Sequence, residues 1–474
     1  MSVDSILRER FGLEALRPLQ AAVIERVMAG GDALVVAPTG SGKSLCYQLP
    51  ALALPDEGFT LVFSPLIALM EDQVASLKER GIRAGYINST LSKKERERRY
   101  RRTAEGAYEI LYVTPERMEK PEFRAALEER RVKLLAVDEA HCISKWGHDL
   151  RPAYRQVGRF REILGHPPTL ALTATATPAV RDDIRTILGD DPEGMPLFAD
   201  LGERENLDLQ VVEIWGDDDR VNHIREVADE VQGTGIVYFT LIRDLERMAD
   251  RLRKEIPDRE VGIYHGRLLP AEKKRVYDRF AAARPEDGLL LLATNAFGLG
   301  VDKPDIRFIV HAQVPGSIEA YYQEVGRAGR DGLPSRCVLL YAQDDLAIQQ
   351  EFAEWTNPPP DLIRRAVHAL EASGHHDFDA EELNRDLFGR TRVDRRLEYT
   401  LIALDHLGVI EPTPVPERFR LARSLEEADL EADEMAAKRQ RDLARLLDVV
   451  KMVREGDPRR TVRAYFDLEE VDAS

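Results

Sequence analysis

Short apolar segments alternate with longer stretches of helical periodicity over the first part of the chain. Five β-rich apolar segments come first, at residues 33–37, 60–64, 110–114, 134–138 and 169–173, and five more follow, at residues 235–240, 261–265, 289–294, 306–311 and 336–341. Nearly continuous apolar strands separated by helices are typical of parallel sheets that are covered on both faces. Because the two series are divided near residues 190–204, the pattern predicts an α/β fold with two tandem parallel-sheet domains, residues 1–200 and 201–345.

The pattern changes after residue 345. Three consecutive prolines interrupt the chain at 358–360, and leucines at helical spacing between 362 and 404 then predict three helices. Strand-like segments at 408–410 and 418–421, separated by a proline-rich turn, predict a β-hairpin, and three helices followed by a hairpin are typical of a winged helix. We therefore expect a winged helix over residues 346–423, with a plain helical bundle and a loop as the alternative. Residues 424–474 are expected to form a helical C-terminal segment.

Composition places the chain among soluble globular proteins. The length of 474 residues suggests roughly three units of ~150 residues each. No apolar run approaches the ~20 residues that cross a bilayer, and no secretory signal opens the chain, so no membrane partner is expected. The three cysteines, Cys46, Cys142 and Cys337, are far apart and form no CxxC pair. This favours a cytoplasmic protein without disulfides, and zinc is not expected.

The net charge of −17 favours an acidic enzyme without a polyanionic partner. Charge is nevertheless uneven along the chain, because residues 425–434 are heavily acidic and residues 93–102 are basic. Net charge does not describe a local groove, so a nucleic-acid partner is not excluded. Any such binding should be sensitive to salt.

A phosphate-binding loop is indicated at residues 37–44, where the chain reads APTGSGKS between a predicted strand and a predicted helix. Glycines let backbone N–H groups close around a phosphate, and the helix N-terminus adds a favourable dipole. The predicted nucleotide-binding residues are Thr39, Gly40, Ser41, Gly42, Lys43 and Ser44. Lys43 would reach the β and γ phosphates of ATP, and the Ser44 hydroxyl would hold Mg²⁺. The alternative is a glycine turn that begins a helix.

An acidic pair follows the fourth predicted strand. Asp138 and Glu139 stand at its carboxyl end, the edge at which open α/β sheets bind ligands. Asp138 would hold Mg²⁺, and Glu139 would orient and polarise the attacking water. An isolated acidic pair is more often a solvated strand end, but pairing with Lys43 favours catalysis.

Residues 138–141 read DEAH, and residues 142–154 resemble the aromatic-rich loop of RecQ helicases, with Leu150 where that family usually has phenylalanine. Further segments match the family's motifs in order, at residues 11–20, 64–70, 114–117, 173–177, 293–304 and 323–330. The chain thus resembles the superfamily 2 DEAH-box DNA helicases of the RecQ family over about residues 8–342. The resemblance implies two RecA-like domains.

The resemblance also assigns roles to individual residues. Arg17 and Gln20 would read the adenine, and Asp302 would contribute to nucleotide binding. Arg327 and Arg330 would act as arginine fingers supplied by the second domain. Without the preceding motifs, these arginines would be interpreted as a surface pair on a helix.

A further group would bind DNA or couple binding to hydrolysis: His141, Trp146, His148, Arg151, Tyr154, Thr173, Thr175 and Gln323. Aromatic side chains that stack on bases tolerate any sequence, which suits a translocating motor. The alternatives are a packing role for Trp146 and plain strand positions for Thr173 and Thr175.

The resemblance implies an ATP-dependent DNA helicase that uses ATP and Mg²⁺, moves 3′ to 5′ on single-stranded DNA and acts on forked duplexes in repair or recombination. A monomer is expected. The alternatives are an RNA helicase or remodeller, and a DNA-stimulated ATPase adaptor without strong unwinding. Bacterial relatives usually carry a four-cysteine zinc module after the motor, but residues 457–466 resemble only the arginine-rich helix of that module. We therefore expect a zinc-free C-terminal segment.

Overall fold

The computed structural model describes residues 2–55, 58–88, 90–128, 130–144, 152–189, 194–200, 204–298, 303–373, 378–389, 394–413, 418–430 and 432–467. Its contacts divide the chain into two compact units. The first contains residues 1–313, 319–340 and 455–474, and the second contains residues 314–318 and 341–454. Two parallel sheets lie in the first unit, and we call the part around residues 2–200 the first lobe and the part around residues 204–340 the second lobe.

The first lobe is built on a seven-stranded sheet of order β3-β4-β2-β5-β6-β1-β7. All its neighbouring strands pair in parallel, which confirms the predicted sheet. The strands are β1 (Ala33–Val36), β2 (Phe59–Phe63), β3 (Ala84–Ile87), β4 (Ile110–Val113), β5 (Val132–Asp138), β6 (Thr169–Thr173) and β7 (Leu197–Ala199). The sequence pattern had not indicated β3 or β7, which are short and lie at the two edges of the sheet.

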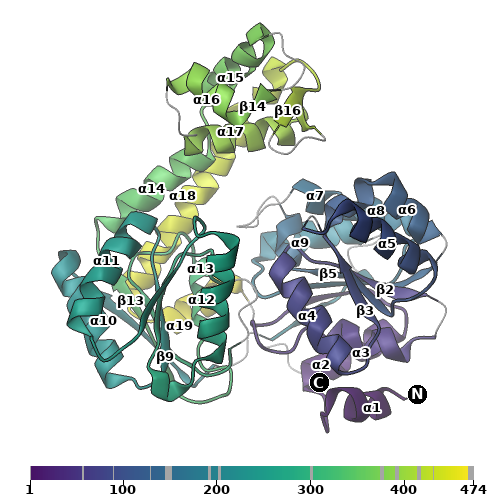
Figure 1. Ribbon diagram of the computed structural model, residues 1–474, viewed down its shortest axis with the longest axis horizontal. Coiled ribbons are helices and arrows are strands. Elements are labelled where there is room, and N and C mark those ends of the chain that lie inside the picture. The colour runs from purple at the N-terminus through teal and green to yellow at the C-terminus, as the bar shows by residue number, and fades with distance from the viewer. Residues whose placement is uncertain are drawn as a thin grey trace. The chain divides into compact units, whose positions relative to one another are not determined.

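Helices cover both faces of this sheet (Figure 1). The helices of this lobe are α1 (Val3–Ile6), α2 (Pro18–Met28), α3 (Leu45–Ala53), α4 (Ile67–Glu79), α5 (Lys93–Ala104), α6 (Pro121–Glu128), α7 (Pro152–Arg155), α8 (Val157–Ile163) and α9 (Pro178–Leu188). Among the described residues, helix α1 packs on α3 and not on the sheet. Successive residues of a strand point to opposite faces, so Leu135 and Val137 of β5 pack in one core and Leu134 and Ala136 in the other. This two-sided burial explains why the strands are apolar throughout.

The second lobe has a six-stranded sheet of order β10-β11-β9-β12-β13-β8. Its strands are β8 (Leu207–Glu213), β9 (Thr234–Tyr238), β10 (Val261–Tyr264), β11 (Leu290–Ala293), β12 (Ile306–His311) and β13 (Ser335–Tyr341). The helices are α10 (Gly216–Glu230), α11 (Ile242–Glu255), α12 (Pro270–Ala282) and α13 (Ile318–Val325). The five predicted strands are confirmed as a parallel array, and β8 was missed because it is an edge strand in which several residues are partly exposed.

The second compact unit is mainly helical. It contains α14 (Asp345–Thr356), α15 (Pro360–Ser373), β14 (Phe378–Asp379), α16 (Ala380–Phe388), α17 (Arg395–His406), β15 (Ile410–Pro412), β16 (Arg418–Leu421) and most of α18 (Ala432–Glu455). The three strands form an antiparallel sheet of order β14-β16-β15 around a shared apolar core. The predicted hairpin is thus present, and a helical bundle with a plain loop is wrong. The winged-helix assignment stays a prediction.

One further helix, α19 (Pro458–Phe466), follows α18 and groups with the first unit. Val462 and Phe466 on this helix are buried. Among the described residues no helix is long and apolar enough to cross a membrane.

Candidate nucleotide site

The loop between β1 and α3 has the backbone that a phosphate cradle requires. Gly40 and Gly42 both have φ of +81°, a left-handed conformation that side-chain-bearing residues rarely adopt. The Nζ of Lys43 lies over the start of the loop, where it donates hydrogen bonds to the backbone carbonyls of Ala37 at 2.7 Å and Pro38 at 3.0 Å. Desolvation lowers the pKa of Lys43, although Glu139 and Asp138 oppose that shift. A bound phosphate would compensate this ammonium group.

The two residues expected to read adenine lie against the same loop. The Oε1 of Gln20 accepts from the backbone N–H of Arg17 at 3.0 Å, which caps α2, and its Nε2 donates to the carbonyl of Ser41 at 3.2 Å. Nη1 of Arg17 also donates to Ser41, at 3.2 Å. A Cβ added at Gly42 would lie 2.7 Å from Nε2 of Gln20, so this glycine also makes room for the contact.

The acidic pair lies at the carboxyl end of β5, as predicted. Desolvation and the adjacent Glu139 raise the pKa of Asp138 to about 7, while Lys43 lowers it. A divalent cation would favour the ionised form of this carboxyl. The oxygen donors of Ser44 and Asp138 are of the kind Mg²⁺ prefers, with nucleotide phosphates and water completing its shell. The residues present therefore fit an ATP-bound Mg²⁺ ion.

A series of polar contacts leads from the acidic pair to the second lobe. Nδ1 of His141 lies 3.2 Å from Oε2 of Glu139 and 2.9 Å from Oγ1 of Thr173. The same Thr173 hydroxyl bonds the backbone of Thr175, and Oγ1 of Thr175 accepts from Nε2 of Gln323 at 3.0 Å. Four of the predicted coupling residues are thus adjacent in space. Because Gln323 lies on α13, these contacts connect the acidic pair in one lobe to the helix that precedes Arg327 and Arg330.

The two predicted arginine fingers occupy different positions. The side chain of Arg330 packs against the phosphate loop, since a Cβ added at Gly40 would lie 3.0 Å from its Cδ. The positive charge of Arg330 also contributes to the lowered pKa of Lys43. Arg327 is buried and donates to the carbonyl of Gly298 within its own lobe. Of the pair, Arg330 is therefore the one at the nucleotide site.

The remaining residues expected to contact DNA or nucleotide are either outside the described residues or do not occupy the expected position. Trp146, His148, Arg151 and Asp302 lie outside the described residues. Tyr154 is fully buried, and its hydroxyl donates to the backbone carbonyl of Asp138 at 3.2 Å. The expectation that Tyr154 stacks on bases does not fit this position, because the ring has no exposed face. It instead supports the end of the strand that carries the acidic pair.

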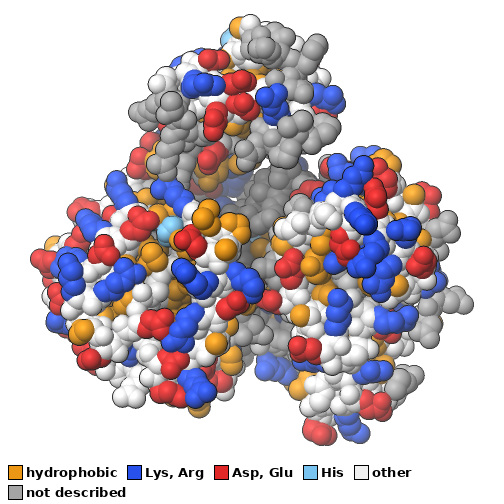
Figure 2. All heavy atoms as spheres, viewed as in Figure 1, with side chains coloured by type: hydrophobic (Ala, Val, Ile, Leu, Met, Phe, Trp, Pro, Cys, Tyr) orange, Lys and Arg blue, Asp and Glu red, His pale blue; other side chains and the backbone are white. Residues whose placement is uncertain are grey.

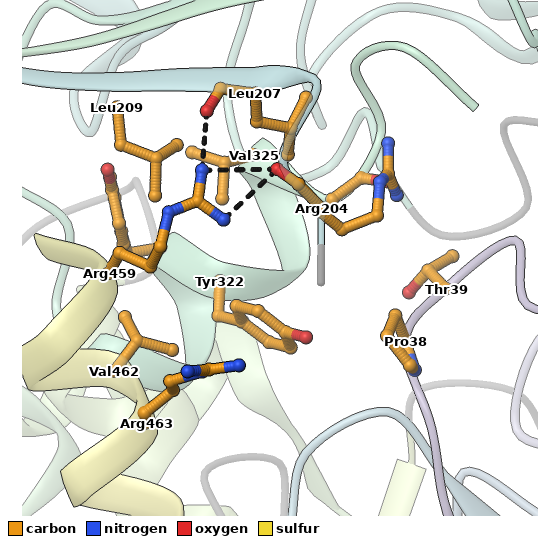
Figure 3. A pocket seen from close by; sticks show the side chains of 12 residues that line it. Pro38, Thr39, Arg204, Leu207, Leu209, Tyr322, Val325, Arg459, Val462 and Arg463 are labelled. Carbon is orange, nitrogen blue, oxygen red and sulfur yellow. Dashed lines mark hydrogen bonds between the residues drawn. The ribbon is translucent and has the colours of Figure 1, made fainter. Parts of the chain in front are cut away.

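A small pocket opens between the phosphate loop, α13 and α19 (Figure 3). Its walls come from all three parts of the first unit: Pro38, Thr39, Arg204, Leu207, Leu209, Tyr321, Tyr322, Val325, Gly326, Arg459, Val462 and Arg463. Arg204 and Arg459 were not identified from the sequence. Arg459 lies in the segment 457–466 that resembles an arginine-rich helix, but the sequence gives neither residue a role at the nucleotide site. Only the folded chain shows that they lie behind residues 323–330, the arginine motif that carries Arg327 and Arg330.

The first lobe carries a phosphate loop and the acidic pair of a DEAH sequence, and the second lobe carries the two arginines of residues 323–330. This combination defines the two-lobed core of a nucleotide-dependent helicase. The family model described as DEAD/DEAH box helicase matches residues 17–184, and the one described as helicase conserved C-terminal domain matches residues 219–332. The crystal structure of the DUF1998 helicase MrfA bound to DNA has a similar fold, with a TM-score of 0.59, 22% identity, and coverage of 89% of this chain and 62% of that one.

Similarity to curated proteins identifies the family. The ATP-dependent DNA helicase RecQ of Bacillus subtilis is 44% identical over 74% of this chain and 58% of its own length. The probable ATP-dependent DNA helicase RecS of the same organism is 37% identical over 79% of this chain and 74% of its own length. The chain therefore belongs to the RecQ family of helicases, although it spans less than two thirds of RecQ itself.

Proposed function

We propose that this protein is an ATP-dependent DNA helicase that moves 3′ to 5′ along single-stranded DNA and unwinds forked duplexes in repair or recombination. The observation that carries the proposal is a series of polar contacts between the lobes: Glu139 lies 3.2 Å from His141, and hydrogen bonds continue from His141 through Thr173 and Thr175 to Gln323. A side chain that orients water in one lobe is thereby connected to the element that brings Arg330 from the other. Hydrolysis and movement of the lobes can then be coupled.

Each residue of the site has a defined task in this reaction. Lys43 binds the β and γ phosphates, and Ser44 with Asp138 would hold Mg²⁺, which neutralises charge on the phosphates. Glu139 orients the attacking water, and Arg330 stabilises charge on the transferred phosphoryl group. Because Arg330 comes from the second lobe, the site is complete only when both lobes contribute.

DNA is the proposed polymer because the curated relatives are named as DNA helicases. The net charge of −17 disfavours a polyanionic partner but does not exclude one, because Lys and Arg side chains gather locally, as they do on the first lobe (Figure 2). One groove of this lobe is lined by five basic residues: Lys78, Arg83, Arg98, Arg99 and Arg102. Trp146, His148 and Arg151 remain the proposed stacking and phosphate contacts, and Asp302 a proposed nucleotide contact.

The proposal extends to the oligomeric state, the metal and the cellular compartment of the protein. We propose a monomer with Mg²⁺ as the metal, without a structural zinc, in a reducing cytoplasm. The three cysteines are all buried and lie outside any disulfide in the described structure, which is compatible with that compartment.

The test is a pair of assays on the full chain. Wild-type protein should hydrolyse ATP in response to single-stranded DNA and unwind a forked duplex, and Lys43→Ala should abolish both activities. Lys254→Ala removes an exposed lysine from α11 of the second lobe, and it should behave as wild type. Full hydrolysis by Lys43→Ala would reject the site. Stronger stimulation by RNA of equal length would favour the RNA helicase, and hydrolysis without unwinding would favour the adaptor.

A further inference from the structure

The turn that precedes β8 donates hydrogen bonds to the backbone of the arginine motif, residues 323–330. The Nη1 of Arg204 donates to the carbonyl of Gly326 at 3.3 Å, and its Nη2 donates to the carbonyl of Ala328. Nδ2 of Asn206 donates to the carbonyl of Gly329 at 2.8 Å. These carbonyls lie on both sides of the first motif arginine and immediately before the second. The turn at 204–206 therefore fixes the path of the segment from which both guanidinium groups project.

The turn is itself held by Arg459 of α19. Nη1 and Nη2 of Arg459 each donate to the carbonyl of Arg204 at 3.1 Å, and Nη2 also donates to the carbonyl of Leu207 at 2.7 Å (Figure 3). A planar guanidinium can serve both carbonyls at once, which the single ammonium of a lysine does less well. Arg459 thus joins the C-terminal helix to the turn that grips the arginine motif.

Helix α19 keeps its place by contacts that do not involve Arg459. The hydroxyl of Tyr465 donates to Oε1 of the buried Glu319 at 2.8 Å, and the ring of Phe466 lies 5.5 Å from that of Tyr322 on α13. Val462 and Phe466 are both buried. Removing the Arg459 guanidinium should therefore release the turn while leaving the helix in place.

We propose that Arg459 is a positioning residue for ATP hydrolysis, acting through Arg204 on Arg327 and Arg330. The proposal rests on the proposed helicase function. In this chain the C-terminal arginine-rich helix then supports the catalytic arginines from behind, and it does so through side-chain hydrogen bonds to backbone carbonyls.

The experiment compares Arg459→Ala with Arg460→Ala in the full chain. Arg460 is the next residue of the same helix and has an exposed side chain, so it matches the change in charge and helix propensity. Arg459→Ala should lower kcat for DNA-stimulated ATP hydrolysis by roughly 10- to 100-fold, because small displacements of catalytic groups have effects of that size. The KM for ATP should change little, since the phosphate and adenine contacts come from the first lobe. Arg459→Lys should restore part of kcat.

A double substitution separates positioning from general destabilisation. If Arg459 acts through the Arg204 side chain, Arg459→Ala should add little to the loss of kcat that Arg204→Ala causes alone. The proposal would be overturned if Arg459→Ala lowered kcat by the same factor in the wild-type and Arg204→Ala backgrounds. It would also be overturned if Arg460→Ala lowered kcat as much as Arg459→Ala, or if Arg459→Ala and Arg459→Lys both had wild-type kcat. A wild-type protein without DNA-stimulated hydrolysis would instead reject the helicase function on which it rests.

Discussion

The hydrogen bond between Thr175 and Gln323 directly joins the two lobes, and Thr175→Val removes it with almost no change in shape. Oγ1 of Thr175 accepts from Nε2 of Gln323 at 3.0 Å, and Thr175 is only 1% exposed. A hydrogen bond between neutral groups contributes about 0.5–1.5 kcal/mol. If that energy is used to hold the lobes in their hydrolytic arrangement, its loss should lower kcat roughly 2- to 10-fold.

The assay is a double-mutant cycle on DNA-stimulated ATP hydrolysis with Thr175→Val and Gln323→Ala. Each change should lower kcat, and the second should cost little once the first is made, which corresponds to a coupling energy of about 1 kcal/mol. Thr186→Val is the matched control, because that hydroxyl is exposed and bonds only the carbonyl of Asp182 in its own helix, at 2.8 Å. Strictly additive losses from the two substitutions would refute the proposed link.

Two other substitutions test the structure at different levels. Gly40→Ala and Gly30→Ala both place a methyl group at φ +81° and should each lower stability by about 1–2 kcal/mol. Only the methyl group at position 40 meets the side chain of Arg330, so only Gly40→Ala should also reduce ATP hydrolysis. Equal hydrolysis in the two variants would contradict this. Arg161→Ala removes the partner of the half-buried Asp32, 2.8 Å away, and should lower the free energy of unfolding by about 3–5 kcal/mol in a denaturant titration. Arg253→Ala breaks an exposed ion pair and should lower the free energy of unfolding by less than about 1 kcal/mol. Similar midpoints for these two arginine variants would show that burial does not decide the strength of the pairs.

The sequence alone was sufficient for the features that depend on chain neighbours. The phosphate loop is a local succession of strand, glycine turn and helix, so the loop could be predicted from the sequence. The phosphate-binding role of Lys43 and the Mg²⁺-binding role of Ser44 stay predictions. Asp138 was predictable for the same reason, because a buried strand delivers its last residue to the ligand-binding edge of the sheet. The edge strands β3, β7 and β8 escaped prediction since they are short or only half-buried and have no continuous apolar pattern.

Only the tertiary structure decided which way several side chains point and which distant segments meet. Tyr154 has the residue type of a base-stacking platform, but packing places its ring inside the first lobe. Arg327 and Arg330 look equivalent in the sequence, yet one bonds its own lobe and the other lies against the phosphate loop. The grip of Arg459 on Arg204 joins residues 255 positions apart. Periodicity reports which face of an element is buried, whereas contacts between elements depend on how their side chains pack, and no pattern along the chain records that.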